Sequence, residues 1–334
     1  MTKTSFGRLK TGEEIYSYIL NNGSIEAEVI TYGARLRAFR RVGSHNIVGS
    51  FDTLDDYVRD NSYQGAIIGR VADRIADAKF TIDGVEYHLS KNSGKDCIHG
   101  GGVFSRSAWG IENADDTSLT LSYYSHDGEC GFPGGMRTLV TYSLVGDALV
   151  IDYKAYPEKK CPISLTNHAY FNLMGLGGDV YSHEVSLYAD KYAEIDKYLI
   201  PTGEHPDVDG TPLDLRVPRI LGEAIKDIFP GYDHSFCLCP REFKNFLGER
   251  LGLAAMVKCD GLALSVYTNA TDLVFYTANG LAGSPDFAGG VKCINHGALC
   301  LEAETEPNAV NSGKGIYDAG EVYRQTTVYE LCEV

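Results

Sequence analysis

The sequence predicts an all-β protein that is built mainly of antiparallel sheet. Three observations support this prediction: apolar and polar residues alternate along many short segments, two-residue turns that contain glycine join several of these segments, and helical patterns are rare. The chain shows no regular alternation of strands and helices, no repeat of fixed period and no linker rich in proline, glycine and serine. We therefore expect residues 1–334 to form a single domain.

Two hairpins are predicted in the first 90 residues. The segment "YSYILNNGSIEAEVITYG" (16–33) indicates two strands that turn at Asn22-Gly23. The segment "KFTIDGVEYHL" (79–89) indicates a second pair around Asp83-Gly84, because aspartate followed by glycine tolerates the positive φ angles of a type I′ turn. Between the two hairpins, "DTLDDYV" (52–58) favours one turn of helix.

The same alternation continues through the rest of the chain. It predicts a strand over 118–125 and a hairpin over 138–156 that turns at Gly146-Asp147. Further strands are expected within 183–196 and 272–280. One longer helix is expected in "VPRILGEAIKDIF" (217–229), where apolar residues recur at helical spacing.

The composition disfavours several classes of protein. The 334 residues carry a formal net charge of −15, whereas nucleic acids and anionic membrane surfaces attract patches of lysine and arginine. No apolar run approaches the roughly 18 residues of a transmembrane helix, and the first residues lack the apolar core of a signal peptide. We therefore expect a small-molecule partner and no binding to nucleic acid or membrane.

The nine cysteines are scattered, odd in number and without a C-x-x-C pair. A disulfide framework is not expected from this pattern, and a reducing compartment fits it. The sequence therefore predicts a cytoplasmic location.

The segment "LTNHAYFNL" (165–173) places His168 inside an otherwise apolar strand. One interpretation is a buried histidine whose hydrogen bonds are satisfied by its neighbours. The other is a proton donor or acceptor, since imidazole exchanges protons near neutral pH. This segment alone supports both interpretations equally.

Two further segments combine charged residues with tight turns. "GRVADRIADAKF" (69–80) carries Asp73 and Arg74 just before a predicted strand, and "DCIHGGG" (96–102) places His99 before three glycines. Taken singly, the first fits a surface salt bridge and the second fits a histidine in a turn. Each also fits a ligand contact, because glycine lets a ligand approach the backbone closely.

Acidic residues gather in "GYDHSF" (231–236), which carries Asp233, and in "LEAETEPNAVN" (301–311). Glu302, Glu304 and Glu306 have strand spacing and should share one face. A solvated edge strand would explain them, but the preceding apolar residues indicate a strand that emerges from the core.

Together these segments resemble the aldose 1-epimerases, the galactose mutarotase family. The resemblance extends over nearly the whole chain, and the matching segments occur in the family's order. They are "YGARLRAF" (32–39), "SFDTLDDY" (50–57), "GRVADRI" (69–75), the hairpin at 79–89, "NSGKDCIHGG" (92–101), "LTNHAYFNL" (165–173), "IPTGE" (200–204), "GTPLDLR" (210–216), "GYDHSF" (231–236), "FYTANGL" (275–281), "LEAETEPNAVN" (301–311) and "AGEVY" (319–323).

The resemblance implies a large antiparallel β-sandwich, the supersandwich of the family, with few short helices and an open groove. It implies the interconversion of the α and β anomers of a free hexose or similar aldose, with no cofactor and no metal. His168 matches the family's catalytic acid and Glu302 its base. The matching sugar-contacting positions are Asp73, Arg74, His99 and Asp233, while Tyr170 and Phe275 are expected to offer apolar surfaces to the sugar.

The chemistry agrees with these assignments. Anomer exchange requires that the C1 hydroxyl loses a proton and that the ring oxygen gains one, so one acid and one base are the minimum set. Glu302 is preferred to Glu304 as the base because the family's base lies five residues before the proline, here Pro307.

Four positions depart from the usual family residues. Asp73 replaces an asparagine, Val274 and Glu304 replace glutamines, and Asn308 replaces an aspartate. Because the first two positions tend to contact sugar hydroxyls, these departures concern the preferred sugar more than the type of reaction. A second carboxylate beside the base should raise the pKa of the coupled pair.

Three other functions remain open from the sequence. A non-catalytic carbohydrate-binding protein of the same fold is one, since binding residues differ. A glycoside hydrolase that uses Asp233 and Glu302 is another, because such enzymes need two carboxylates. A zinc enzyme built on His99, His168 and a carboxylate is the third, although no ligand pair with short spacing occurs.

Overall fold

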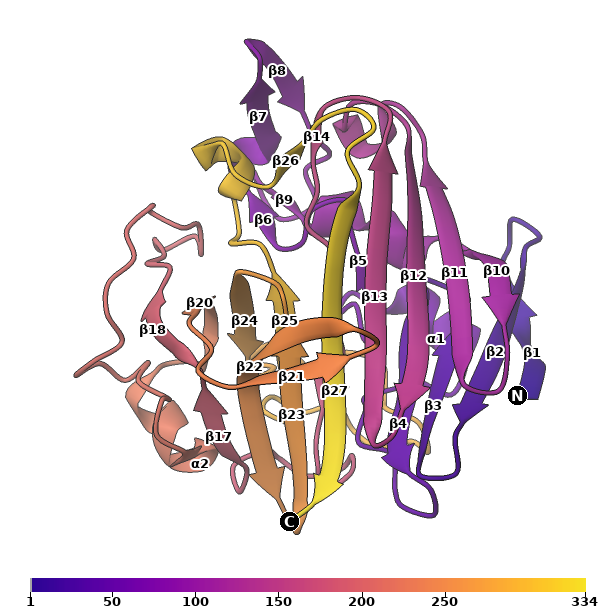
Figure 1. Cartoon of the computed structure of the whole chain (residues 1–334), viewed down its shortest axis with the longest axis vertical. Coiled ribbons are helices and arrows are strands. Elements are labelled where there is room, and N and C mark those ends of the chain that lie inside the picture. Colours follow the sequence, from indigo (N-terminus) through magenta and orange to yellow (C-terminus); the bar gives the residue numbers. More distant parts are fainter. Residues whose placement is uncertain (1) are drawn as a thin grey trace.

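A long antiparallel sheet forms one layer of the fold. The computed structural model describes residues 2–334, and this sheet has ten strands among them. The carboxyl-terminal strand lies in its middle and joins its two halves (Figure 1). In hydrogen-bonded order the strands are β10 (Gly110–Ala114), β11 (Ser118–Ser125), β12 (Met136–Val145), β13 (Ala148–Pro157), β27 (Tyr323–Glu333), β23 (Leu262–Thr268), β22 (Glu249–Cys259), β17 (Glu184–Leu187) and β19 (Arg219–Ile220), with β21 (Phe243–Phe246) paired to β22.

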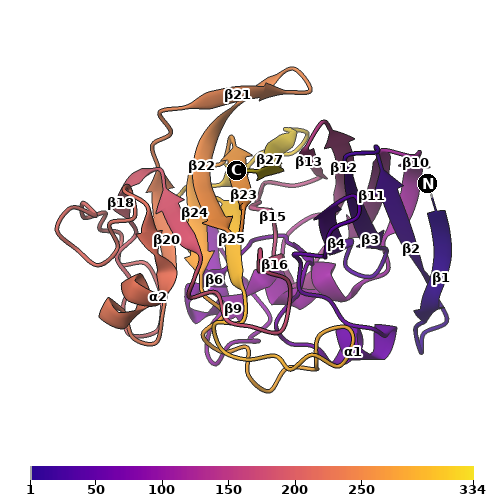
Figure 2. The same ribbon diagram turned by 90° about the horizontal axis from the view of Figure 1, so that it is seen from below.

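Two smaller antiparallel sheets form the facing layer (Figure 2). The first has four strands and lies against the β10–β13 half of the long sheet; the second has five and lies against the other half. The first consists of β1 (Thr2–Arg8), β2 (Glu14–Asn21), β3 (Ile25–Ile30) and β4 (Arg35–Arg41). The second has the order β16 (Tyr170–Phe171), β25 (Leu299–Glu304), β24 (Asp272–Tyr276), β20 (Asp233–Leu238) and β18 (Ala189–Tyr192).

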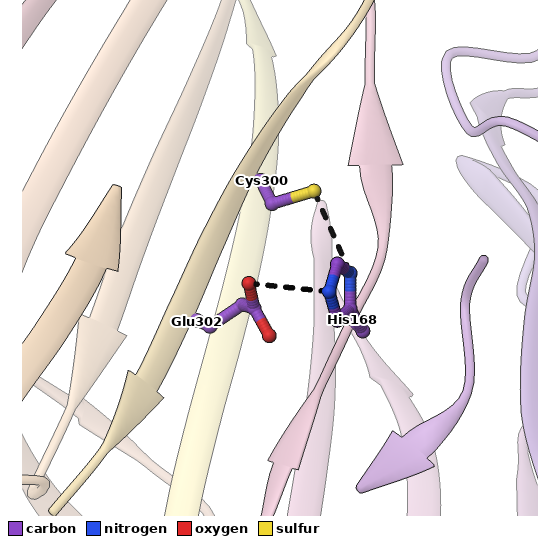
Figure 3. A group of neighbouring side chains, drawn as sticks. All are labelled: His168, Cys300 and Glu302. Atoms are coloured by element: carbon purple, nitrogen blue, oxygen red, sulfur yellow. Dashed lines mark hydrogen bonds and ion pairs between the residues drawn. The ribbon is translucent and has the colours of Figure 1, made fainter. Parts of the chain in front are cut away.

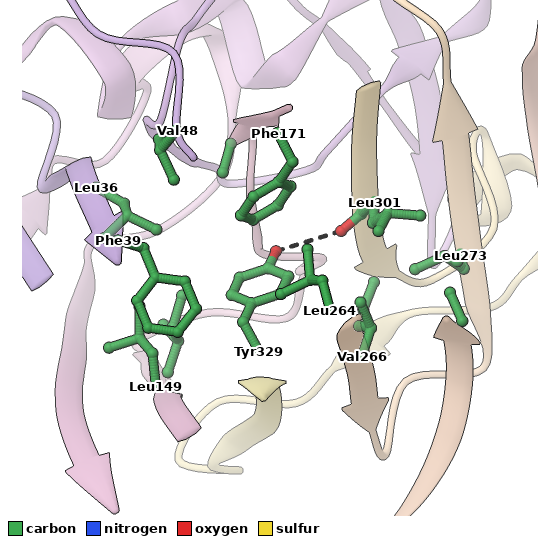
Figure 4. Packing of buried hydrophobic residues seen from close by; sticks show 14 of the residues in the cluster. Leu36, Phe39, Val48, Leu149, Phe171, Leu264, Val266, Leu273, Leu301 and Tyr329 are labelled. Carbon is green, nitrogen blue, oxygen red and sulfur yellow. Dashed lines mark hydrogen bonds between the residues drawn. The ribbon is translucent and has the colours of Figure 1, made fainter. Parts of the chain in front are cut away.

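The hydrophobic core fills the space between the two layers (Figure 4). Phe39 of β4 and Leu149 of β13 pack at one end, and Leu301 of β25 packs with Leu264 of β23 at the other. Tyr329 of β27 bridges the layers, because its hydroxyl donates a hydrogen bond to the backbone oxygen of Leu301 at 3.2 Å. This bond fixes the height of β25 above the long sheet.

Short strand pairs and turns connect these sheets. The pairs are β5 (Ile67–Ile68) with β15 (Thr166–Asn167), β6 (Arg74–Ile75) with β9 (Cys97–Ile98), β7 (Lys79–Ile82) with β8 (Val85–His88), and β14 (Cys161–Pro162) with β26 (Ile316–Tyr317). The turns of 3-10 helix are Ala76–Ala78, His99–Gly102, Phe104–Arg106, Glu129–Gly131, Ile225–Asp227 and Ala309–Ser312.

The predicted fold class is confirmed, since strands dominate and the helices are few and short. All pairs of named strands are antiparallel. The turn of helix expected near residues 52–58 is α1 (Leu54–Arg59), which begins where the Thr53 hydroxyl accepts a hydrogen bond from the amide of Asp56. In the described residues, no helix is long and apolar enough to cross a lipid bilayer.

The predicted hairpins are also confirmed. Asp83 and Gly84 join β7 to β8 with φ angles of 51° and 80°, as a type I′ turn requires. The turn at Asn22-Gly23 joins β2 to β3, and that at Gly146-Asp147 joins β12 to β13.

The helix predicted over 217–229 is wrong in length. Only α2 (Leu221–Ala224) and the short 3-10 turn after it are helical. Arg219 and Ile220 instead extend the long sheet as β19, where Ile220 lies opposite Glu184. Sheet pairing at the edge of β17 therefore replaces the first helical turn that the apolar spacing suggested.

A buried arginine anchors the segment that leads to Asp73. The Arg70 side chain is only 1% exposed. Its guanidinium donates hydrogen bonds to the backbone oxygens of Ser125, His126, Pro133 and Gly134 at distances of 2.7 to 3.0 Å. Because three buried acceptors and one partly buried acceptor depend on one side chain, this contact joins residues 69–73 rigidly to the loop after β11.

We expect Arg70→Met to lower the free energy of unfolding by about 3 kcal/mol, because it leaves several buried carbonyl groups without a donor. The midpoint of urea unfolding measures the effect. The matched control is Arg59→Met, which changes an arginine whose side chain is 70% exposed and should shift the free energy of unfolding by less than about 0.5 kcal/mol. Equal midpoints for both variants would contradict the anchoring role of Arg70.

Candidate functional site

One cavity brings together all but one of the residues to which the sequence assigned a catalytic or binding role; the exception is Phe275. It has a volume of about 260 Å³, which suits a ligand smaller than a typical drug. The residues with predicted roles that line it are Asp73, Arg74, His99, His168, Tyr170, Asp233 and Glu302. They come from five different regions of the chain, so the fold and not local sequence assembles the group.

Strand alternation along β25 determines which side chains reach the cavity. Leu301 and Ala303 belong to the core between the layers, whereas Glu302 and Glu304 line the cavity. Both glutamates are almost fully buried, with exposed fractions of 3% and 1%. The expectation of a shared face is confirmed for Glu302 and Glu304, and a solvated edge is excluded for them. It is wrong for Glu306, which lies beyond the end of β25 and pairs with His205 and Lys314 outside the cavity.

The expectation for Phe275 is wrong. On β24, Val274 lies opposite Glu302 and lines the cavity, so its neighbour Phe275 points to the other side of the sheet. There Phe275 is fully buried in the core and packs against the ring of Tyr232 at 5.0 Å. Tyr276, two residues after Val274, lines the cavity instead.

Sequence reasoning therefore missed two aromatic residues of the site. Tyr276 could have been found from the period of two that starts at Val274. Tyr63 also lines the cavity, and its ring lies edge-on to His99 at 4.6 Å. It belongs to an irregular loop with a φ angle of 59°, and no pattern in the sequence indicated its position.

Backbone hydrogen bonds hold His168 between β15 and β16. Its amide donates to the oxygen of Ala66 at 2.9 Å, and its own oxygen accepts from the amide of Gly65 at 2.8 Å. The side chain of the preceding Asn167 donates to the oxygen of Gly65 at 2.7 Å. Asn172 likewise donates to the oxygen of Gly297 at 3.0 Å. The side-chain amides of Asn167 and Asn172 thus attach the segment that carries His168 to the neighbouring backbone.

The imidazole of His168 has a polar partner at each nitrogen (Figure 3). Its Nε2 lies 3.6 Å from Oε1 of Glu302, and its Nδ1 lies 3.6 Å from Sγ of Cys300. Cys300 and Glu302 stand on the same face of β25, so one strand supplies both partners. The ring of Tyr170 stacks on the imidazole at 5.1 Å with an angle of 18° between the planes.

Burial shifts the pKa values of this pair in opposite directions. Desolvation, reinforced by nearby His99, lowers the pKa of His168 well below its usual value of 6.5. Desolvation also raises the pKa of Glu302 well above 4.5, and the charges of Asp73 and Asp233 raise it further. Because one pKa falls and the other rises, the pair holds one proton over a wide range of pH.

Asp73, just before β6, and His99, just after β9, are joined by two hydrogen bonds. Both have left-handed backbones, with φ angles of 53° and 52°, which is uncommon outside glycine. The amide of Asp73 donates to Nδ1 of His99 at 3.1 Å, and the amide of His99 donates to the oxygen of Asp73 at 3.0 Å. With Nδ1 acting as an acceptor, the neutral imidazole of His99 carries its proton on Nε2.

The other polar groups of the cavity differ in charge state. Burial, followed by the charge of Arg74, lowers the pKa of His99 to about 3, so His99 is a neutral donor. Burial, followed by the charge of Asp73, raises the pKa of Asp233 to about 7. Arg74 Nη1 lies 3.0 Å from Oδ1 of Asp73. Asn308 does not line the cavity; its Oδ1 accepts a hydrogen bond from the amide of Ala76.

A metal ion would find a poor set of ligands here. Within residues 2–334, His168, Cys300 and Glu302 form the group whose possible ligand atoms all lie within 4.8 Å of one another. His99, which the zinc hypothesis requires, is not part of this group. The zinc site that the sequence suggested, with His99 and His168 as joint ligands, is therefore not formed by this group.

Comparison with known proteins relates the chain to one family along nearly its full length. The sequence model of the family described as aldose 1-epimerase matches residues 16–330. The galactose mutarotase of Rattus norvegicus is 37% identical over 342 aligned positions, which cover 99% of this chain and 98% of that protein. The aldose 1-epimerase of Escherichia coli (strain K12) is 34% identical, with 93% of each chain covered.

Solved structures share the fold. An aldose epimerase homologue from C. elegans superposes with a TM-score of 0.85 at 25% identity and covers 95% of this chain and 99% of its own. The galactose 1-epimerase of Lactobacillus acidophilus superposes with a TM-score of 0.86 at 24% identity, over 99% of this chain and 98% of its own. The β-sandwich expected from the resemblance is therefore confirmed.

The electrostatics of the cavity predict that His99 and His168 stay neutral when the pH of the free protein falls from about 8 to about 6, because burial opposes their charged forms. Ring-proton NMR shifts recorded across this range measure the charge state. The same titration in urea provides the unfolded reference, in which the titration midpoint of both rings should be about pH 6.5. A folded-state midpoint for His168 at or above the unfolded one would contradict the prediction.

Proposed function

The chain belongs to the aldose 1-epimerase family, and on this premise we propose that His168 and Glu302 interconvert the α and β anomers of a free hexose or a similar aldose. The chain is thus an isomerase of carbohydrate metabolism. The observation that supports the two roles is the placement of His168 Nε2 and Glu302 Oε1 3.6 Å apart in the wall of one small polar cavity. A proton acceptor and a proton donor are thereby held within reach of one bound sugar.

The reaction needs two proton transfers and one rotation. Glu302 takes the proton of the C1 hydroxyl, and His168 gives a proton to the ring oxygen while the bond between C1 and that oxygen breaks. The open-chain aldehyde then turns about its C1–C2 bond, and closure from the other face returns both protons. No atom is oxidised or reduced and no group leaves, so the balanced reaction consumes no co-substrate.

The proton of the pair must lie on His168 before the ring opens. Burial favours the opposite state, in which Glu302 is protonated and His168 is neutral. A bound sugar changes this balance, because hydroxyl groups that donate hydrogen bonds to Glu302 stabilise its carboxylate form. We therefore propose that substrate binding itself moves the proton to His168 and prepares the acid.

The remaining polar groups would orient the sugar. Arg74 and the Nε2 hydrogen of His99 donate, so they suit the ring oxygen and hydroxyl oxygens. Asp233 and Asp73 accept hydrogen bonds from hydroxyl groups in their ionised forms. Tyr170, stacked on His168, offers a flat apolar surface to a sugar face.

We also propose a cytoplasmic location. All nine cysteines are free thiols in this structure, which fits a reducing compartment.

We expect His168→Asn and Glu302→Gln each to lower kcat by roughly 10²- to 10⁴-fold, because each removes one partner of the acid–base pair. Polarimetry of freshly dissolved α-glucose, α-galactose and L-arabinose measures the rate above the spontaneous one. His205→Asn is the matched control, since His205 lies outside the cavity and pairs with Glu306.

Two results would contradict this function. Spontaneous rates for all three sugars with the folded wild-type protein would exclude a mutarotase of common aldoses. Wild-type rates in folded His168→Asn would exclude His168 as the acid. Release of free sugar from an aryl glycoside would instead favour the hydrolase, and we expect none.

The dependence of kcat/KM on pH should be bell-shaped, because only the pair with one proton is active. Its acidic limb reports protonation of His168 and should fall below 6.5, and its alkaline limb reports loss of the proton held by Glu302 and should lie well above 4.5. The charge of Asp73 raises both pKa values, so Asp73→Asn should move both limbs to lower pH.

The matched control for this profile is Asp77→Asn. Asp77 is an exposed carboxylate four positions along the chain that pairs with Lys95 outside the cavity, and its loss should leave both limbs in place. Unmoved limbs in Asp73→Asn would show that its charge does not act on the pair.

A further inference from the structure

The cavity carries a surplus of acidic groups. Asp73, Asp233, Glu302 and Glu304 all line it, and in the described part of the chain Arg74 is the one lysine or arginine that does so. Arg74 is already engaged with Asp73, at 3.0 Å. A neutral sugar needs one base and a few hydrogen-bond acceptors, so the proposed reaction does not account for the fourth carboxylate.

Glu304 is the carboxylate with no assigned task. It is 99% buried, and Oε1 has no hydrogen-bond partner within residues 2–334. Neither lysine nor arginine approaches its carboxylate within 4.0 Å in the same part of the chain. Burial, followed by the charges of Asp73, Glu302 and Asp272, raises the pKa of Glu304 well above 4.5 and so favours its protonated form. A positive group bound in the cavity would supply donors to this carboxyl and stabilise its carboxylate form.

A bare metal ion does not fit this role. A metal needs several ligand atoms close together, and neither Glu304, Asp73 nor Asp233 belongs to the group of ligand atoms within 4.8 Å of one another. An organic cation fits better, because its positive group can sit at one carboxylate while the rest of the molecule spans the cavity. An ammonium group supplies three donors and one positive charge to such a site.

We propose that the preferred substrate is an aldose with a protonated amino group close to C1, a 2-amino-2-deoxy-aldose, and that Glu304 with Asp73 receives its ammonium group. This inference rests on the proposed function, because it takes C1 to lie at Glu302. Glu304 follows Glu302 by two residues on one strand face, so their Cβ atoms are only about 7 Å apart. A group bound by Glu304 therefore belongs to the part of the sugar next to the reacting carbon.

Val274 supports the same placement. It stands opposite Glu302 on the neighbouring strand and is 4% exposed. Its side chain offers no hydrogen bond to a hydroxyl at this position. Of the two strand neighbours of Glu302 that line the cavity, Val274 and Glu304, Glu304 alone can form a hydrogen bond, and its carboxylate favours a positive group over a hydroxyl.

The kinetic test compares matched sugars. The kcat/KM measured by polarimetry should be at least tenfold higher for D-galactosamine than for D-galactose, and at least tenfold higher for D-glucosamine than for D-glucose. Glu304→Gln keeps the shape of the side chain and removes its charge, and it should lower the ratio of amino sugar to neutral sugar at least tenfold. Glu306→Gln is the matched control on the same chain segment, because Glu306 pairs with His205 and Lys314 outside the cavity.

Asp73→Asn provides a second variant should Glu304→Gln fail to fold, and it should lower the same ratio. If neutral sugars are turned over and the amino sugars are no better, the inference is wrong while the proposed function stands. If the ratio is high but unchanged in both folded variants, another group binds the amine and the inference is also wrong.

A binding test separates the inference from catalysis. Calorimetry with 2-amino-1,5-anhydro-2-deoxy-D-galactitol, which has no anomeric hydroxyl, should show at least tenfold tighter binding than with 1,5-anhydro-D-galactitol. Glu304→Gln should abolish this difference, and Glu306→Gln should retain it. Equal affinities in the wild type would overturn the inference even if no turnover of any sugar were found.

Discussion

The two-sided burial of β25 is the constraint on which the site depends. All six residues of this strand are buried, with leucines and alanine toward the sandwich core and Cys300, Glu302 and Glu304 toward the cavity. A shift of register by one residue would push two carboxylates into the apolar core, so the register is strongly specified. The bond from the Tyr329 hydroxyl to Leu301 adds a fixed distance to the long sheet. The position of Glu302, the base that we propose, thus follows from the packing of its apolar neighbours.

The same burial gives the site its chemistry. Charged groups that leave water are destabilised, and in proteins they respond by changing their pKa values. Here burial lowers the pKa of His168 and raises the pKa of Glu302, so in the free protein the shared proton is favoured on Glu302. The apolar surroundings that stabilise the fold therefore also keep a single proton in the pair that we propose as acid and base.

Features that depend on neighbours in sequence were predictable, and features that depend on distant contacts were less so. The turn at Asp83-Gly84 and the alternation in β3 were correct because φ angles and side-chain direction are local properties. The helix predicted over 217–229 was too long because Arg219 and Ile220 pair with the edge of β17 as a strand. The choice of Phe275 contradicted the alternation that already assigned Val274 to the cavity, so this error was avoidable. Tyr63 was not predictable, since only tertiary contacts bring its loop to His99.

The arrangement of donors and acceptors restricts how a sugar can lie in the cavity. The ring oxygen of a pyranose has no hydrogen and can only accept hydrogen bonds, and in the proposed function Arg74, His99 and His168 are the donors that face it. The C1 hydroxyl must give up its hydrogen, so it must face a carboxylate, and Glu302 lies 3.6 Å from the imidazole of His168. The left-handed backbones of Asp73 and His99 cost roughly 1–3 kcal/mol each, yet their mutual hydrogen bonds fix the His99 donor before any ligand arrives. In the proposed reaction, donors that are fixed in advance need no rearrangement when the ring oxygen gains electron density, which is how such a site stabilises a transition state.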